Sequence, residues 1–124
     1  MIAPDHLRYT RDHHWVSLSG NIATVGVTDY LQNELGTVEF VELPDPGDLE
    51  KGSPCGQIEA SRGETSVFAP ISGEVVEVNT DLVINPRLVN EDPYDRGWIY
   101  KLKVDSPEQY EQLPEVGGYL ATLR

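Results

Sequence analysis

The sequence predicts a small, mainly β domain, a sandwich or a barrel, to which short helices are added. Three observations support this fold class. Short strand-like runs recur along the chain, turn formers such as Gly, Pro, Asn and Asp separate them, and only two segments carry helix-capping signals. A chain of 124 residues has the length of one domain, so we expect residues 1–124 to form a single domain.

The N-terminal part of the chain predicts two strands, one helix and a third strand. The run HWVSLSGNIATVGV reads as two strands around a turn at residues 19–21. Thr28 is suited to be the N-cap of a helix over residues 29–35, and Gly36 stands where that helix would end. The run TVEFVEL resumes strand character and stops at PDPGD, because proline lacks the N–H group that a sheet ladder needs.

The central stretch CGQIEASRGETSVFAPISGEV, residues 55–75, predicts a strand, a tight turn and a return strand. We expect Arg62 and Gly63 to be the central residues of the turn, which places Ile58 opposite Val67. Gly63 tolerates the positive φ that such turns demand. This geometry puts Arg62 in solvent at the outermost point of the hairpin.

The C-terminal part predicts two more strands and a last helix. GEVVEV reads as a strand, and DLVINPRLVNEDPYDRG as turns or short helices. WIYKLKV alternates as a half-buried strand does, and we expect Trp98 to anchor the core. Ser106 caps a helix near residues 107–113, with Pro107 at its first position and Gln109 completing a capping box.

Charge and composition narrow the classes of function. Lys plus Arg is 9 and Asp plus Glu is 21, so the net charge is −12. Such a chain repels phosphate backbones, and we expect no nucleic-acid partner. No stretch approaches the roughly 18 apolar residues of a membrane span, and the N-terminus has no apolar signal core. Cys55 is the only cysteine, so we expect a packed thiol, no intramolecular disulfide and a reducing compartment, the cytoplasm. We also expect a monomer.

Groups that could support catalysis or metal binding are few. His13 and His14 are adjacent, so on a strand they would point to opposite faces and could not easily chelate one metal ion. His6 lies in the N-terminal tail. Glu74 and Glu77 are three apart on a strand, which predicts opposite faces and a solvated surface. We expect no metal site and no enzymatic activity.

The stretch NEDPYDRGW, residues 90–98, is dense in turn formers. Two interpretations stay open for it. It is either a loop held by Asx hydrogen bonds, with Asp92 tying down the turn, or a loop that faces a partner through Asn90, Asp92 and Tyr94.

Taken together, these segments resemble the H protein family of the glycine cleavage system. YTRDHHW is similar to the family's Tyr-Thr-x-x-His-Glu-Trp, with His14 in place of Glu. ATVGVTDYLQNELGTVEFVELPDPGD and APISGEVVEVN follow the family's blocks, as does LVNEDPYDRGW, where Asp95 and Arg96 replace the usual Gly and Glu. The resemblance implies a lipoyl-domain-like barrel-sandwich hybrid, made of two small antiparallel sheets with short added helices. It also implies carriage instead of catalysis.

In that family a lysine at a hairpin tip carries lipoate through an amide bond. The lipoyl arm visits a decarboxylase (P protein), an aminomethyltransferase (T protein) and a dihydrolipoyl dehydrogenase (L protein). Counted from Glu59 forward or from the Ala69-Pro70 pair back, the position of this lysine is Arg62. The resemblance further implies a tip formed around it by Glu59, Ser61, Gly63 and Glu64. The only lysines of the chain are Lys51, Lys101 and Lys103.

Arginine at this position removes the known chemistry. Lipoylation needs a neutral amine, which a lysine with a pKa of ~10.4 can supply, whereas a guanidinium stays protonated and delocalised. We therefore expect no cofactor on this chain, and two hypotheses stay open. The first is a non-lipoylated binding module for glycine-cleavage or other lipoate-handling enzymes, in which Arg62 faces an anionic pocket. The second is a genuine lipoyl carrier of aminomethyl groups in glycine decarboxylation, whose lysine has been replaced by engineering or in a decayed copy.

Overall fold

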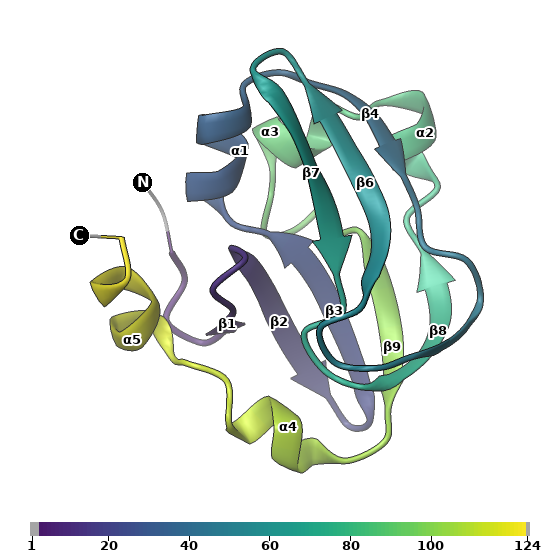
Figure 1. Ribbon diagram of the computed structural model, residues 1–124, viewed down its shortest axis with the longest axis vertical. Coiled ribbons are helices and arrows are strands. Elements are labelled where there is room, and N and C mark those ends of the chain that lie inside the picture. The colour runs from purple at the N-terminus through teal and green to yellow at the C-terminus, as the bar shows by residue number, and fades with distance from the viewer. Residues whose placement is uncertain (1–2, 124) are drawn as a thin grey trace.

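The structure is a computed structural model that describes residues 3–123. Within that range the chain forms nine short strands and five short helices (Figure 1). The strands are β1 (Arg8–Tyr9), β2 (His14–Ser19), β3 (Ile22–Val27), β4 (Val38–Glu42), β5 (Gly47–Leu49), β6 (Pro54–Ala60), β7 (Gly63–Phe68), β8 (Gly73–Val78) and β9 (Tyr100–Val104). The helices are α1 (Asp29–Leu35), α2 (Asp81–Ile84), α3 (Leu88–Glu91), α4 (Pro107–Glu111) and α5 (Val116–Ala121).

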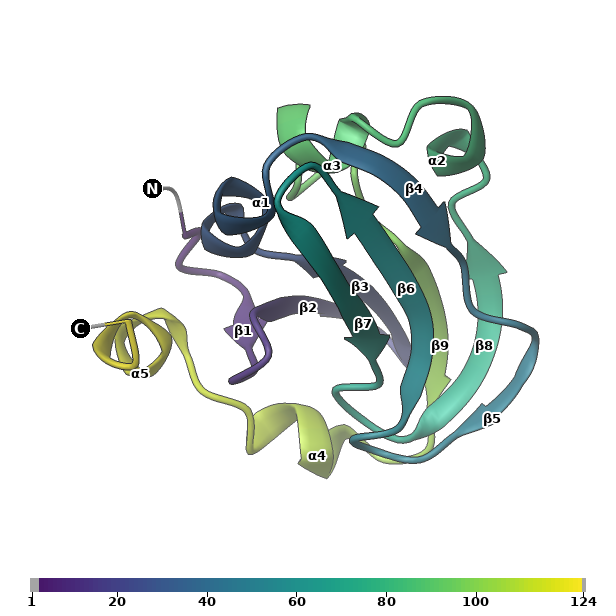
Figure 2. The same cartoon turned by 45° about the horizontal axis from the view of Figure 1, so that its top comes forward.

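The strands form two antiparallel sheets, as predicted. The larger sheet has the order β1-β2-β3-β9-β8-β5, and the smaller has the order β4-β6-β7. Figures 1 and 2 show the smaller sheet lying across the larger one. The main core fills the space between them with the fully buried Ile58 and Val67 of the smaller sheet and Val25 and Leu102 of the larger. Burial of this apolar surface is the main force that holds the two sheets together.

The helix predicted over residues 29–35 is confirmed as α1. The Thr28 hydroxyl accepts a hydrogen bond from the N–H of Leu31 at 3.3 Å, as an N-cap does. Gly36 follows at φ +80°, and its N–H donates to the carbonyl of Gln32 at 3.0 Å. The left-handed conformation that ends this helix favours glycine.

The helix that follows Ser106 is confirmed, but it is shorter than predicted and has no capping box. It ends at Glu111, and the Ser106 hydroxyl accepts from the N–H of Glu108 at 3.3 Å. The side chain of Gln109 does not turn back to the helix start. It accepts from the N–H of Ser72 at 2.6 Å, because a buried connection between β7 and β8 offers it an unpaired donor.

Two elements of the structure, β5 and α5, were not predicted from the sequence. β5 (Gly47–Leu49) begins at the end of PDPGD, after the predicted stop of the preceding strand. It lies at the edge of the larger sheet, where the prolines before it cost no ladder bond. α5 contains Gly117 and Gly118, which are poor helix formers. Its position depends on a distant contact: the buried Tyr119 ring stacks on Tyr9 with 4.7 Å between the ring centroids.

The prediction that Trp98 anchors the core is wrong for the main core, because Trp98 is only partly buried and packs against the second apolar cluster, which contains Trp15. Trp98 is half-buried and precedes β9, and the Lys101 ammonium lies 5.1 Å from its ring centroid. The fully buried residues nearby are Ile99 and, in the second apolar cluster, Trp15, which is 2% exposed. Alternation along WIYKLKV begins only at Tyr100, so it does not determine which way Trp98 faces.

Candidate functional site

The hairpin of β6 and β7 presents a turn of two residues, Ser61 and Arg62. Ile58 lies opposite Thr65, and Ala60 opposite Gly63. The predicted pairing of Ile58 with Val67 is therefore wrong by two residues. Because the error is an even number, both side chains still face the core. Gly63 has φ +151°, so it needs the conformational freedom that was expected of it, but as the first residue of the return strand.

The turn is bound to the end of α1. The N–H of Arg62 donates to the carbonyl of Leu35 at 2.9 Å, and the N–H of Ser61 donates to the carbonyl of Thr37 at 2.9 Å. The Ser61 hydroxyl accepts in return from the N–H of Thr37 at 3.0 Å. These three bonds hold the tip against residues 35–37, and they account for the register, because they fix which two residues form the turn.

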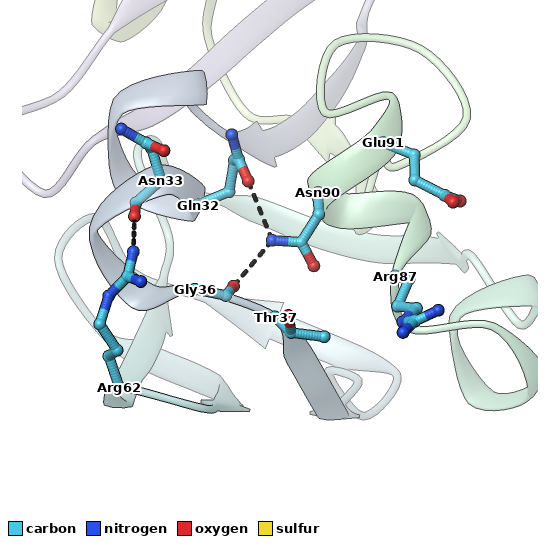
Figure 3. Close-up of a pocket in the computed structure, with 8 residues that line it drawn as sticks. All are labelled: Gln32, Asn33, Gly36, Thr37, Arg62, Arg87, Asn90 and Glu91. Carbon is cyan, nitrogen blue, oxygen red and sulfur yellow. Dashed lines mark hydrogen bonds between the residues drawn. The ribbon is translucent and has the colours of Figure 1, made fainter.

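The Arg62 side chain is exposed, as predicted, but it lies against the end of α1 and does not extend freely into solvent. Its Nε donates to the carbonyl of Glu34 at 3.1 Å, and an η nitrogen donates to the carbonyl of Asn33 (Figure 3). The last carbonyls of a helix have no partner within the helix and carry partial negative charge. A cation at this position satisfies both needs, so Arg62 caps α1.

Gly36 makes the close approach of the tip to α1 possible. A Cβ atom built at this position would collide with the Ser61 hydroxyl and would touch the Arg62 side chain at 3.4 Å. The residue also has φ +80°, where side chains are rare. Both constraints require glycine here.

Beside the tip lies an open groove of about 400 Å³. Its lining consists of polar and charged residues and one glycine, namely Gln32, Asn33, Gly36, Thr37, Arg62, Arg87, Asn90 and Glu91. Figure 3 shows Arg62 and Arg87 on opposite sides of it and Asn90 between them. The groove therefore brings two guanidinium groups into one surface depression of a molecule whose net charge is −12.

Asn90 joins three elements around this groove. Its amide nitrogen donates to the Gln32 side chain at 2.9 Å and to the carbonyl of Gly36 at 2.7 Å, and its oxygen accepts from the N–H of Val38 at 2.8 Å. The amide protons and the oxygen are thus all engaged in holding α3 to the end of α1 and the start of β4. The structure brings Asn90 close to Arg62 in a structural role, and a partner-facing role stays a prediction.

Asp92 and Tyr94 lie outside the groove lining. The Asp92 carboxylate accepts from the N–H and the Nε of Arg96, both at 3.3 Å, so Asp92 ties down the turn as predicted. The Tyr94 hydroxyl accepts from the N–H of Asp29 at 2.9 Å at the start of α1. Burial raises the pKa of Tyr94 to about 12, so this hydroxyl stays neutral at physiological pH.

Two carboxylates flank the tip on its outer surface. Glu59 on β6 lies directly opposite Glu64 on β7, and both are exposed. Like charges in this arrangement are unfavourable for the sheet. Among the contacts of the described residues, the Arg62 guanidinium binds the carbonyls of α1 and forms no ion pair with either carboxylate. The tip thus presents two negative charges, from Glu59 and Glu64, beside the positive charge of Arg62, which is bound to the carbonyls of α1.

The histidines have structural roles. His14 is 1% exposed; its Nε2 accepts from the N–H of Phe68 at 3.0 Å, so its Nδ1 donates to the carbonyl of Asp12 at 3.0 Å. Burial lowers the pKa of His14 to about 4, so the ring is neutral and ties β2 to the end of β7. His13 has φ +63° and shares a hydrogen bond of 2.9 Å with the Tyr119 hydroxyl.

Other candidate groups form no site in the part of the chain that is described. Residues 3–123 contain no group of three or more His, Cys, Asp or Glu side chains able to hold a metal ion. A bulge between Val75 and Glu77 places Glu74 opposite Lys103 and Glu77 opposite Lys101. The two glutamates therefore share one face, and the prediction of opposite faces is wrong, although both are exposed.

Burial raises the pKa of the Cys55 thiol, which disfavours reactivity. No helix within these residues is long and apolar enough to cross a membrane.

Comparison with known proteins gives consistent matches over nearly the whole chain. The family model described as glycine cleavage H-protein matches residues 7–124. A glycine cleavage system H protein of Carboxydothermus hydrogenoformans is 41% identical over 127 residues, which cover 94% of this chain and 98% of the relative. The protein of the same name from Anaeromyxobacter dehalogenans is 43% identical over 122 residues, with 98% and 95% covered. One from Staphylococcus epidermidis is 42% identical over 120 residues, with 96% and 95% covered.

A solved structure agrees with these matches. The crystal structure of a glycine cleavage system H protein from Mycobacterium marinum superposes with a TM-score of 0.88 at 30% sequence identity, and covers 98% of both chains. The predicted lipoyl-domain-like barrel-sandwich fold is thereby confirmed.

Proposed function

This chain belongs to the glycine cleavage H-protein family, and on that premise we propose that it is a carrier-type scaffold whose hairpin tip does not take lipoate. The family carries lipoate within a multienzyme system. Our proposal is that Arg62 occupies the position of the lipoyl-bearing lysine. The chain would then act as a non-catalytic binding module for the P, T or L protein or for another lipoate-handling enzyme.

The observation that carries this proposal is the chemistry of the tip. Arg62 is one of two residues in the turn between β6 and β7, and its guanidinium is an obligate cation. An acyl transfer to form an amide needs a nucleophilic amine, and no lysine lies in the hairpin. Lys51 lies beyond β5, while Lys101 and Lys103 are on β9 of the other sheet. None of the three occupies a hairpin tip.

The shape of the tip supports a binding role. Arg62 holds the turn to α1 through its side chain and its backbone, so the hairpin keeps one conformation without a cofactor. A preformed surface loses little conformational entropy on association. The proposal describes a one-domain, monomeric, cytoplasmic protein, without a nucleic-acid or membrane partner.

The second candidate function, a genuine lipoyl carrier with a replaced lysine, has one observation in its favour. Position 62 is exposed at a two-residue turn, so a modifying enzyme could reach a side chain at this position. A lysine there could donate to the same carbonyls of α1 in place of Arg62 and could leave them when modified.

Intact-mass measurement tests the proposal. The protein purified from its natural host should have the mass of the unmodified chain, and a lipoyl adduct on any residue would refute it. A binding assay with the purified P, T and L proteins should show that at least one of them associates with the unmodified chain. Absence of binding to all three would count against the glycine-cleavage role.

An Arg62→Lys variant separates the two candidates. Co-expressed with a lipoate ligase and lipoate, it should gain a lipoyl group if the chain is a carrier disabled at one residue. A folded variant that stays unmodified would favour a chain specialised for binding. An Arg62→Gln variant is the matched control, since it keeps hydrogen-bond donors at the tip but has no amine.

A further inference from the structure

Several large apolar side chains are exposed, and the elements that carry them are neighbours in the fold (Figures 1 and 2). Among the described residues they are Phe40, Val76, Val83 and Ile84, which are 53%, 49%, 68% and 88% exposed. They belong to β4, β8 and α2, which lie side by side in both views (Figures 1 and 2). We name Phe40, Val83 and Ile84 the α2 patch, because α2 packs against β4. Scattered exposed apolar residues need no explanation, but a group of this kind marks an interaction surface.

The fold itself does not require apolar residues at these positions. α2 is a single helical turn in which Leu82, 1% exposed, supplies the contact with the core. Val83 and Ile84 follow it and face solvent, where polar residues would stabilise the turn equally well. Phe40 lies opposite Glu59 on the outer surface of the smaller sheet, while its neighbour Val41 faces the core. Covering these three side chains would bury apolar area that folding leaves in water.

The two chain segments that carry the α2 patch are rich in acidic residues, although Glu74 and Glu77 lie opposite Lys103 and Lys101 in the larger sheet. Residues 37–50 contain five Asp or Glu residues and residues 73–85 contain three, eight in all, and neither segment contains Lys or Arg. Of these acids, Glu39, Glu42 and Asp81 are exposed next to the patch residues in β4 and α2. Arg87, the next cation along the chain, lines the groove with α1 and Arg62. The patch therefore combines an apolar centre with a negative rim.

We propose that the α2 patch is a docking surface for a partner protein whose own apolar side chains are edged by lysine or arginine. The proposal rests on the binding role given above and adds a second contact surface to the hairpin tip. Charge decides between occupants. A second copy of this chain also has a net charge of −12, and a symmetric contact through this surface would place acidic rim against acidic rim. An anionic membrane surface would be repelled in the same way.

The apolar part of the surface is tested with a Val83→Ser/Ile84→Ser variant. The probe is a synthetic amphipathic helix made only of leucine and lysine, labelled for fluorescence anisotropy. The wild-type protein should bind it, and the variant, whose net charge is unchanged, should bind at least about tenfold more weakly. Equal affinity of the two proteins, or no binding to the wild type, would overturn the proposal. Both positions are exposed, so the thermal unfolding of the variant should match the wild type.

The negative rim is tested with two charge-reversal variants of equal net charge. Glu42→Lys/Asp81→Lys changes the rim, and Glu108→Lys/Glu111→Lys changes α4, which lies away from β4 and α2 in Figure 1. The rim variant should weaken binding of the leucine–lysine helix several-fold more than the α4 variant does. Equal effects would show that only overall charge matters, and would overturn the assignment to this surface.

Purified P, T and L proteins separate failure of this inference from failure of the proposed function. If one of them binds wild type and the Val83→Ser/Ile84→Ser variant equally well, the binding role stands and the α2 patch is refuted as its surface. If none binds, but the leucine–lysine helix discriminates as expected, the glycine-cleavage role falls and the surface stands. Sedimentation of the wild type should show a monomer, and a dimer that is lost in the variant would overturn the proposal in favour of self-association.

Discussion

The buried His14 should make this protein lose stability in mild acid. In the native state the ring is enclosed, accepts from the N–H of Phe68 and donates to the carbonyl of Asp12. Burial is the main cause that lowers its pKa from 6.5 to about 4, with His13 adding to it and Asp12 opposing it. An imidazolium would lose the bond from Phe68, because both ring nitrogens would then be donors.

The size of the effect follows from the two pKa values. The unfolded chain takes up a proton near pH 6.5 and the native state only near pH 4, so the unfolded state binds more protons between them. Stability is therefore fully present above about pH 7 and falls as the pH drops through this window. The complete loss corresponds to about 3 kcal/mol, of which about 2 kcal/mol is already lost at pH 5. That is a large part of the usual stability of a small domain.

Urea unfolding at pH 7.5 and pH 5 measures the loss, and His14→Gln isolates it. The variant should be less stable than wild type at pH 7.5, but should lose about 2 kcal/mol less on going to pH 5. His6→Gln, which removes an exposed histidine instead of the buried one, is the matched control. Equal pH dependence in wild type and His14→Gln, or an NMR titration of His14 near pH 6.5, would refute the reasoning.

Three further predictions concern stability and can be checked by thermal or urea unfolding. Gly36→Ala should lower the free energy of unfolding by at least about 2 kcal/mol, because a methyl group there meets the Ser61 hydroxyl. Gly20→Ala, at φ +62° in open space, should lower it by about 1 kcal/mol. Equal losses in the two variants would contradict the steric argument. Asn90→Ala should lower the free energy of unfolding by about 2–3 kcal/mol, because it leaves the N–H of Val38, the carbonyl of Gly36 and the side chain of Gln32 without their hydrogen-bond partner. Trp15→Ala should lower the free energy of unfolding by about 3–5 kcal/mol, because Trp15 is buried. Trp98→Ala should lower it by less than about 2 kcal/mol, because Trp98 is only half-buried. The reverse order would show that Trp98 is the stronger anchor.

Much of the local structure could be predicted because its signals act within a few residues. Thr28 and Gly36 delimit α1 through bonds that span three or four positions, and Ser106 starts α4 in the same way. The turn between β2 and β3 and the alternation in β9 are equally local. Contacts over long sequence separations were not predictable in this way. Gln109 bonds to Ser72 instead of to its own helix, since a helix sequence carries no information about a distant unpaired donor.

For the candidate site, residue identity and the order of the blocks along the chain were enough to predict that Arg62 stands at the hairpin tip and has no nucleophilic amine. The contacts that Arg62 makes at this position depend on the fold of the chain and could not be predicted. Its bonds reach Asn33 and Glu34, which are 29 and 28 positions away, and the same docking sets the register of the hairpin. The physical reason is that the unpaired carbonyls at the end of α1 attract a cation from whichever segment folding brings close, and sequence spacing does not show which segment that is.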